Sequence, residues 1–195
     1  MKIGAKIYIK NMVCQRCILA VQEILGDLEL TPIHIQLGEV VLAEKPTDRK
    51  LQALKKALEK IGFELLDDAR KKEIEKIKTT VIENIHYQEG AKFSFPKLLS
   101  RELNKEYSQI SKLFSETEGI TIEQFVIMQK IEKTKELLAY RQMNLNEISF
   151  ELGYSSAAHL SAQFKKLTGL TPSAFKKQGG GMRKPLDAVG NSNRI

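Results

Sequence analysis

The chain lacks several features that would assign it to a familiar class of protein. It has two cysteines and three histidines, and no Ser/His/Asp set, phosphate-binding loop or carboxylate pair stands in a convincing context, so we expect no enzymatic activity. No apolar run reaches the length of about 18 residues that a membrane-spanning helix requires. The opening MKIGAKIYIK alternates apolar and polar residues, unlike a signal peptide. We therefore expect a cytoplasmic protein with no membrane partner.

The two cysteines, Cys14 and Cys17, form one C-x-x-C motif. In a reducing cytosol this spacing favours a metal or redox role over a structural disulfide. Two thiolates so placed can face one ion and suit a soft metal such as Cu(I), but they are too few for a closed structural zinc site. We expect Cys17 at a helix N-terminus, where the helix dipole lowers the pKa of a thiol, with Arg16 adding positive charge.

The net charge of +7 lies entirely in the rear of the chain. Residues 1–68 contain 10 Lys and Arg against 10 Asp and Glu, whereas residues 69–195 contain 21 against 14. A neutral front and a basic rear predict two separate roles, with a polyanion as the partner of the rear. An ordinary solvated surface could show the same excess of positive charge.

Residues 1–68 predict a small domain with the element order strand, helix, strand, strand, helix, strand. Apolar residues alternate along 5–10 and 33–37, as in half-buried strands, and recur at helical spacing along 18–28 and 51–61. Gly38-Glu39 predicts a hairpin turn, and a last strand follows the second helix. This order is the ferredoxin-like βαββαβ pattern. The fold class that we expect is therefore a two-domain α+β protein with a ferredoxin-like front.

The segment Asn-Met-Val-Cys-Gln-Arg-Cys at 11–17, between strand and helix, resembles the metal-binding loop of heavy-metal-associated domains. The resemblance covers the first third of the chain and implies that the two cysteines bind a soft ion, Cu(I) or Zn(II), with Met12 packed beneath the loop. The family usually has Gly and Thr where this chain has Asn11 and Val13. Three interpretations stay open: a metal sensor, a redox-switching dithiol, and a fold reused as an assembly module.

Two further segments flank the rear domain. Residues 69–87 predict a charged amphipathic helix whose apolar stripe recurs at helical spacing, and 88–92 predict a loop. We expect 69–92 to connect the domains and to pack on the rear one. The last segment, 179–195, has no apolar period and predicts a flexible tail with no assigned function.

Residues 93–178 contain a repeat at a fixed offset of 50 residues. The string FSETEGITIEQF at 114–125 matches FKKLTGLTPSAF at 164–175. Each copy predicts two helices joined by a tight turn, for which Asn104 and Gly153 supply the left-handed residue. In the second copy, Asn144 and Glu147 predict a capping box at the start of the first helix. This is the outline of a helix-turn-helix, whose second helix enters the major groove of DNA. A repeated helical hairpin with its caps is hard to explain as generic packing.

A continuous helix over 121–142, capped by Thr121, is predicted between the two copies. Roughly 20 residues span about 30 Å in a helix. That length is close to the ~34 Å between successive major-groove faces of B-DNA. A rigid rod of this length would present both recognition helices to one side of the duplex.

The repeated F-x-x-x-x-G-x-T pattern with its linker helix resembles the AraC/XylS family of bacterial transcription regulators over about residues 75–178. The resemblance implies binding to two successive major grooves of double-stranded DNA, with RNA polymerase as a further partner. By position, the groove-facing residues would be Ser108, Ser111 and Lys112 in the first recognition helix, and Ala157, Ala158, His159 and Ala162 in the second.

The second set is poor in polar groups, and it departs from the family in this respect. An alanine can contact a thymine methyl group but cannot form bidentate hydrogen bonds to a base. We therefore expect the second helix mainly to position the protein, with phosphate contacts from Lys165, Lys166, Lys176 and Lys177.

Together these patterns predict a DNA-binding transcription regulator that responds to metal or thiol state through its C-x-x-C motif. The alternative is a metal-binding, chaperone-like protein whose helical domain serves protein interaction.

Overall fold

The structure, a computed structural model, describes residues 5–66, 69–88, 94–140, 143–177 and 184–190. The chain forms two compact units, Met1–Thr79 and Thr80–Ile195, and the boundary between them falls inside one helix, α3 (Ala69–His86). Each unit is described separately below.

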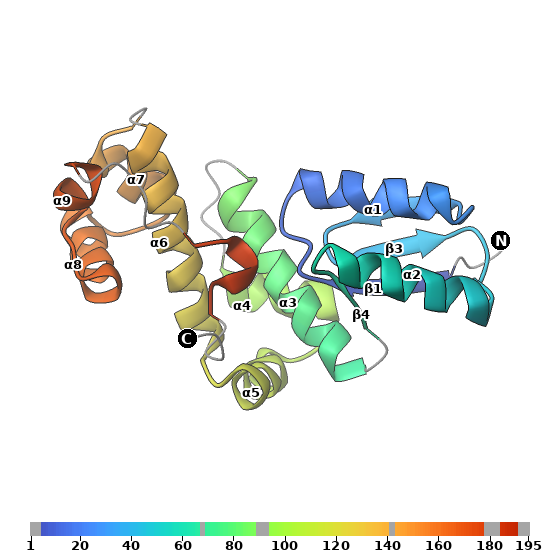
Figure 1. Cartoon of the computed structure of the whole chain (residues 1–195). Helices are drawn as coiled ribbons and strands as arrows, with labels where there is room; N and C mark the ends of the chain where they lie inside the picture. The colour runs from blue at the N-terminus through green and yellow to red at the C-terminus, as the bar shows by residue number, and fades with distance from the viewer. Residues whose placement is uncertain (1–4, 67–68, 89–93, 141–142, 178–183, 191–195) are drawn as a thin grey trace. The chain divides into compact units, whose positions relative to one another are not determined.

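The first unit contains a small antiparallel sheet (Figure 1). Its elements are β1 (Ala5–Lys10), α1 (Gln15–Asp27), β2 (Pro32–Gln36), β3 (Glu39–Leu42), α2 (Asp48–Lys60), β4 (Glu64–Leu66) and the first half of α3. The strands lie in the order β2-β3-β1-β4, and every neighbouring pair is antiparallel. The observed order of elements is the order that the sequence predicts.

The core of this unit lies between one face of the sheet and the helices α1 and α2, which lie side by side (Figure 1). Fully buried apolar side chains from strands and helices meet there: Ile9, Val40, Val21, Leu25, Leu54 and Leu58. The start of α2 is fixed by Thr47, whose hydroxyl oxygen accepts the backbone N–H of Lys50 at 3.3 Å. The apolar residues that alternate along the strands and those that recur at helical spacing therefore form one core.

One strand departs from the predicted alternation. The pairing of β2 with β3 shifts register between Pro32 and His34, and Ile33 is 62% exposed. A bulge changes the face to which the following side chains point. The prediction that apolar residues along 33–37 share one buried face is therefore wrong at Ile33.

The opposite face of the sheet is contacted by the first half of α3. The ammonium of Lys72 lies 5.5 Å from the ring centroid of Tyr8, which alternates with the core residues of β1. At the hairpin, Gly38 has a φ of +76° and approaches α3 so closely that an added Cβ would lie 3.0 Å from Thr79 Cγ2. Glycine is required there for both its backbone conformation and its small size.

The second unit is helical. It contains the rest of α3, then α4 (Phe95–Leu103), α5 (Tyr107–Glu118), α6 (Ile122–Tyr140), α7 (Leu145–Glu151), α8 (Ala157–Thr168), α9 (Pro172–Lys177) and a short 3-10 helix, η1 (Leu186–Ala188). The bounds of α5 and α8 differ by the 50-residue offset of the repeat. None of the helices in the described part of the chain is long and apolar enough to cross a membrane.

The two copies of the repeat have equivalent cores. The rings of Phe114 and Phe125 pack with centroids 5.7 Å apart, and those of Phe164 and Phe175 pack at 5.5 Å. All four side chains are fully buried. The phenylalanines that define the repeat in the sequence are thus the residues that join each recognition helix to the helix after it.

Residues 184–190, which we call the strap, pack against α6. The backbone N–H of Lys184 donates to Glu132 Oε2 at 3.1 Å, and Gln129 Nε2 donates to the carbonyl oxygen of Leu186 at 3.3 Å. Because the strap has backbone and side-chain partners on α6, the prediction of a flexible tail over 179–195 is wrong for these seven residues. The remaining residues of that tail lie outside the described ranges.

The strap is anchored over a buried charge pair and an aromatic ring. Lys135 Nζ lies 2.6 Å from Glu132 Oε1, and each side chain is 7% exposed. Val189 is buried beside them, and Gly190 sits against the ring of Phe125. A buried carboxylate needs all of its partners, so the strap N–H that Glu132 accepts contributes to the stability of α6.

Replacing Gly190 with alanine should destabilise the second unit. Gly190 has a φ of +89°, and the new Cβ would lie 2.8 Å from Phe125 Cδ2, which is held by its packing on Phe114. We expect a loss of about 1–3 kcal/mol in the free energy of unfolding, measured by denaturant titration. Gly26→Ala is the matched control, because a Cβ at Gly26 in α1 meets nothing within 4 Å. Equal effects of the two substitutions would contradict the docking of the strap.

Candidate functional site

The second helix-turn-helix, formed by α7 and α8, is defined by local caps. Asn144 Oδ1 accepts the backbone N–H groups of Asn146 and Glu147 at 2.9 and 3.1 Å, and Glu147 Oε2 accepts the N–H of Asn144 at 2.7 Å. This capping box is the one that the sequence predicts. Gly153 ends the helix with a φ of +68°, and Ser156 caps α8 by accepting the N–H of His159 at 3.1 Å.

The first helix-turn-helix, formed by α4 and α5, uses different residues for the same turn. Asn104 adopts the left-handed conformation with a φ of +51°, as predicted for this position. The hydroxyl of Tyr107 donates to Glu123 Oε1 and so ties the start of α5 to α6. Burial and this carboxylate raise the pKa of Tyr107, and the same hydrogen bond lowers the pKa of Glu123.

Most of the predicted DNA-contacting residues lie on the exposed side of their helices. On α5, Ser108 and Lys112 are exposed and Ser111 is half-buried. On α8, the exposed residues are Ala158, His159, Ala162, Lys165 and Lys166, whereas Ala157 is half-buried. The buried side of each helix is occupied by one Ile or Leu and one Phe, so the reading face points away from the core.

His159 is held in place by the turn that precedes α8. Its Nδ1 lies 3.1 Å from Ser155 Oγ, and its ring meets the ring of Tyr154 edge-on at 5.3 Å. The Tyr154 hydroxyl donates to Gln163 at 2.9 Å, and burial raises the pKa of Tyr154 to about 12. Lys130 of α6 lies 5.2 Å over the same ring, and burial lowers the pKa of this lysine. His159 is the only polar residue among the four groove-facing residues predicted for α8. Its contacts within the protein fix the orientation of its ring.

Gln109 is a candidate contact that the sequence analysis missed. It is exposed on α5 and stands 50 residues before His159, so the two occupy equivalent places in the repeat. A glutamine can form bidentate hydrogen bonds to adenine in the major groove. Applying the 50-residue offset of the repeat to His159 would have identified Gln109 as its counterpart.

The two recognition helices differ in charge at equivalent positions. Lys112 on α5 corresponds to Ala162 on α8, and Glu116 corresponds to Lys166. Lys112 Nζ lies 3.9 Å from Glu116 Oε1, with both side chains mostly exposed. The reading face of α5 therefore carries polar groups able to bind base edges, whereas α8 ends in two lysines suited to phosphates.

Comparison with known proteins agrees with this geometry. Residues 99–178 match the family model described as a helix-turn-helix domain. A probable transcriptional regulator, LumQ, of Photobacterium leiognathi is 30% identical over 105 residues, 54% of this chain and 42% of the relative. The Msm operon regulatory protein of Streptococcus mutans is 27% identical over 94 residues, 48% of this chain and 34% of the relative.

The chain thus spans less than half the length of either relative. Among solved structures, a DNA-binding transcriptional dual regulator from Escherichia coli K-12 is similar with a TM-score of 0.47 and 17% identity, covering 55% of this chain and 91% of that one. The sheet-containing unit lies outside the residues that match the family model.

The second candidate site is the loop between β1 and α1. Cys14 is the N-cap of α1, and its Sγ lies 3.4 Å from Cys17 Sγ, well beyond the ~2.05 Å of a disulfide bond. Both thiols are partly exposed. Met12 is fully buried within the core beneath this loop, as the sequence predicts.

The pKa values of the two thiols shift in opposite directions, and that of Cys17 departs from the prediction. Burial raises the pKa of Cys14, but hydrogen bonds from Cys17 and from the backbone of Arg16 outweigh it, so the net pKa is lowered. The pKa of Cys17 is raised, because burial and the neighbouring Cys14 oppose its ionisation. The expectation of a lowered pKa for Cys17 is wrong, because burial and the neighbouring Cys14 thiol outweigh the backbone hydrogen bonds that favour its thiolate.

The dithiol supplies two soft ligands, which suit a soft ion and are too few for a closed metal site. Its sulfurs lie 3.4 Å apart, so both can contact one ion. Within the residues that the structure describes, no group of three His, Cys, Asp or Glu side chains could hold a metal. The Asn11 N–H just before this loop donates to Glu75 Oε1 of α3 at 3.1 Å, and the Asn11 side chain donates to the Gly62 carbonyl at 2.9 Å. The loop is therefore fixed from two sides.

Proposed function

We propose that this protein is a DNA-binding transcription regulator of the AraC/XylS type. The observation that carries the proposal is the pair of helix-turn-helix units whose recognition helices have equivalent bounds, equivalent aromatic cores and outward-facing polar residues. The match of 99–178 to a helix-turn-helix domain supports it. So do the descriptions of LumQ and the Msm protein as transcription regulators.

The length of the linker helix supports binding to two successive major grooves. Helix α6 has 19 residues, which corresponds to about 28 Å at 1.5 Å per residue. Successive major-groove faces of B-DNA are ~34 Å apart. One chain would then bind two half-sites without a second copy. RNA polymerase is the further partner that activation by such a regulator requires.

The charge difference between the recognition helices indicates a division of roles. In this proposal, Ser108, Gln109 and Lys112 on α5 contact base edges. On α8, His159 and the alanines lie in the groove while Lys165 and Lys166 bind phosphates. Base contacts set sequence preference, and phosphate contacts mainly set affinity and register.

We further propose that the first unit is a ferredoxin-like sensor domain that responds through Cys14 and Cys17. The antiparallel order β2-β3-β1-β4 with helices on one face supports the ferredoxin-like assignment. The lowered pKa of Cys14 gives it a larger thiolate fraction than an ordinary cysteine has, and the thiolate is the form that binds a soft metal such as Cu(I) or reacts with an oxidant. A bound soft ion would supply a positive charge shared by the two sulfurs.

Helix α3 connects the two units, and its first half is hydrogen-bonded to the backbone beside the cysteine loop. Its first half holds Glu75, which accepts the N–H of Asn11 next to the loop, and its second half belongs to the second unit. Glu75 is buried, so a change in the loop backbone alters the contacts of a carboxylate that cannot simply turn to solvent. Coupling between the sites then follows from linkage.

The alternative, a metal-binding chaperone-like protein, would use the first unit alone. It leaves the two helix-turn-helix units and their outward-facing polar residues unexplained. No observation in the second unit specifically favours it.

The substitution Lys112→Ala should relax base preference more than Ala162→Ser does. The two positions are equivalent in the repeat, so the pair is internally matched. Loss of a base contact removes about 1–3 kcal/mol of discrimination at one position of the site. Binding to a panel of DNA sites by fluorescence anisotropy measures this. A uniform loss of affinity over all sequences, with a shallower salt dependence, would show instead that Lys112 binds phosphate.

A Cys14→Ser/Cys17→Ser variant should keep its fold and basal DNA affinity but lose any response to Cu(I). We expect wild-type DNA affinity to change by about 5- to 150-fold on adding Cu(I) under anaerobic, reducing conditions. Glu75→Gln is the matched variant, because it keeps both thiols and weakens the contact to the loop. It should bind Cu(I) normally with a smaller DNA response. Identical wild-type affinity with and without Cu(I) and oxidant would refute the sensor role.

A further inference from the structure

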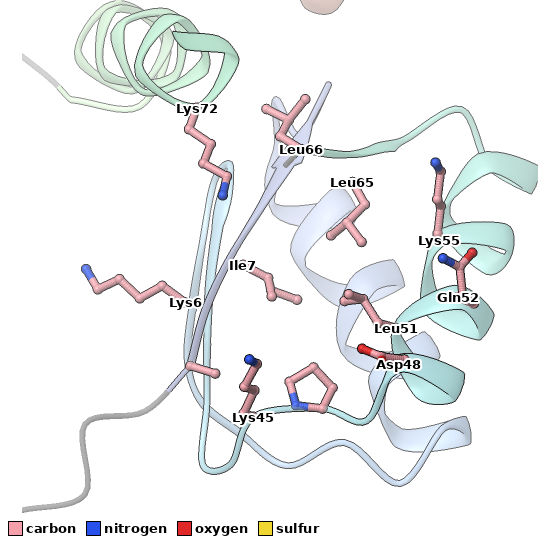
Figure 2. A pocket seen from close by; sticks show the side chains of 12 residues that line it. Lys6, Ile7, Lys45, Asp48, Leu51, Gln52, Lys55, Leu65, Leu66 and Lys72 are labelled. Carbon is pink, nitrogen blue, oxygen red and sulfur yellow. The ribbon is translucent and has the colours of Figure 1, made fainter. Parts of the chain in front are cut away.

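A cavity of about 420 Å³ opens beside the sheet in the first unit (Figure 2). Its walls come from the start of β1, the end of β4 and the first turns of α2, with Lys72 of α3 at its edge. Figure 2 shows Ile7, Leu51 and Leu65 pointing into the space between the strands and α2. The volume falls in the range of about 300–1,000 Å³ that is usual for small-molecule sites.

The cavity is separate from the cysteine loop. Its lining includes Ala5 and Ile7 at the start of β1, whereas the loop follows Lys10 at the other end of that strand. A strand of six residues spans about 20 Å. A ligand in the cavity therefore leaves Cys14 and Cys17 accessible.

The rim of the cavity carries polar side chains with unused bonding capacity. Across the described ranges, no hydrogen bond or ion pair engages the side chains of Lys45, Asp48, Gln52 or Lys55. By contrast, Lys6 is already paired with Glu39 at 3.1 Å. Figure 2 shows Lys6 directed away from the cavity.

The charge of the rim indicates the sign of its ligand. Two lysines, Lys45 and Lys55, stand against one carboxylate, Asp48. The lining therefore carries an excess of one positive charge once Lys6, paired with Glu39, and Lys72, which lies over the Tyr8 ring, are set aside. An apolar floor beneath a cationic rim complements a molecule with a hydrocarbon body and one anionic end. The amide of Gln52 can donate a further hydrogen bond to that end.

We propose that this cavity binds a small carboxylic acid with an aliphatic or aromatic body. The body lies on Ile7, Leu51 and Leu65, and the carboxylate lies at the cationic rim, whose lysines are Lys45 at one end and Lys55 at the other. Asp48 opposes the ligand charge and limits its affinity. The site is independent of DNA binding and goes beyond the function proposed above.

Titration of the full chain with octanoate, followed by NMR of labelled methyl groups, tests the proposal. Octylammonium and octanol have the same body with a positive or neutral end. We expect octanoate to shift the methyl signals of Ile7, Leu51 and Leu65 and to bind more tightly than either control. Shifts centred on other methyl groups, or equal binding of octylammonium, would overturn the proposal.

Four substitutions at exposed positions separate the roles of the rim groups without touching the floor. Lys45→Gln and Lys55→Gln should each weaken octanoate binding by about two- to five-fold, as expected for an exposed ion pair. Asp48→Asn should strengthen it by a similar factor. Lys56→Gln removes the neighbouring lysine of α2, which does not line the cavity, and should change nothing. Unchanged affinity in the three rim variants, Lys45→Gln, Lys55→Gln and Asp48→Asn, would refute a carboxylate site. No DNA is present in this experiment, so its outcome is independent of the regulator proposal.

Discussion

An aromatic pair between each recognition helix and the helix that follows it is the contact on which the second unit depends. Phe114 packs on Phe125, and Phe164 packs on Phe175. Each pair can form only because a left-handed glycine, Gly119 or Gly169, reverses the chain directly after the recognition helix. Since the buried side of each recognition helix is committed to this contact, the opposite side faces solvent with its polar residues. The same packing therefore stabilises the fold and exposes the reading face.

The linker helix α6 serves both copies, and its contacts differ from those of an ordinary amphipathic helix. Four polar residues on it are buried: Gln129, Glu132, Thr134 and Lys135. Gln129 contacts His86 of α3 at 3.0 Å and the strap at 3.3 Å, while Glu132 joins Lys135 to the strap. Buried polar groups tolerate few alternative arrangements, because each must keep its partners. This network fixes the helix that sets the distance between the two recognition helices.

Local signals in the sequence predicted much of this structure. The repeat, the capping box at Asn144 and the left-handed residue at Asn104 were predicted because caps and turns depend on neighbouring residues only.

The strap was missed because its burial depends on partners on α6, about fifty residues away in the chain. The exposure of Ile33 was missed because a bulge leaves no mark in apolar alternation. The raised pKa of Cys17 was missed because its burial and its contact with the Cys14 thiol exist only in the folded loop. The cavity beside α2 has no sequence motif at all.

In the function that we propose, the two helix-turn-helix units, spaced by α6, bind one DNA duplex. Selection of bound sites from a random DNA pool by the full chain tests this most directly. The predicted result is a site with two short half-sites whose centres lie about one helical turn apart, with the sharper base preference in the half-site that contacts α5. Enrichment of a single half-site, or of no sequence, would contradict the central claim.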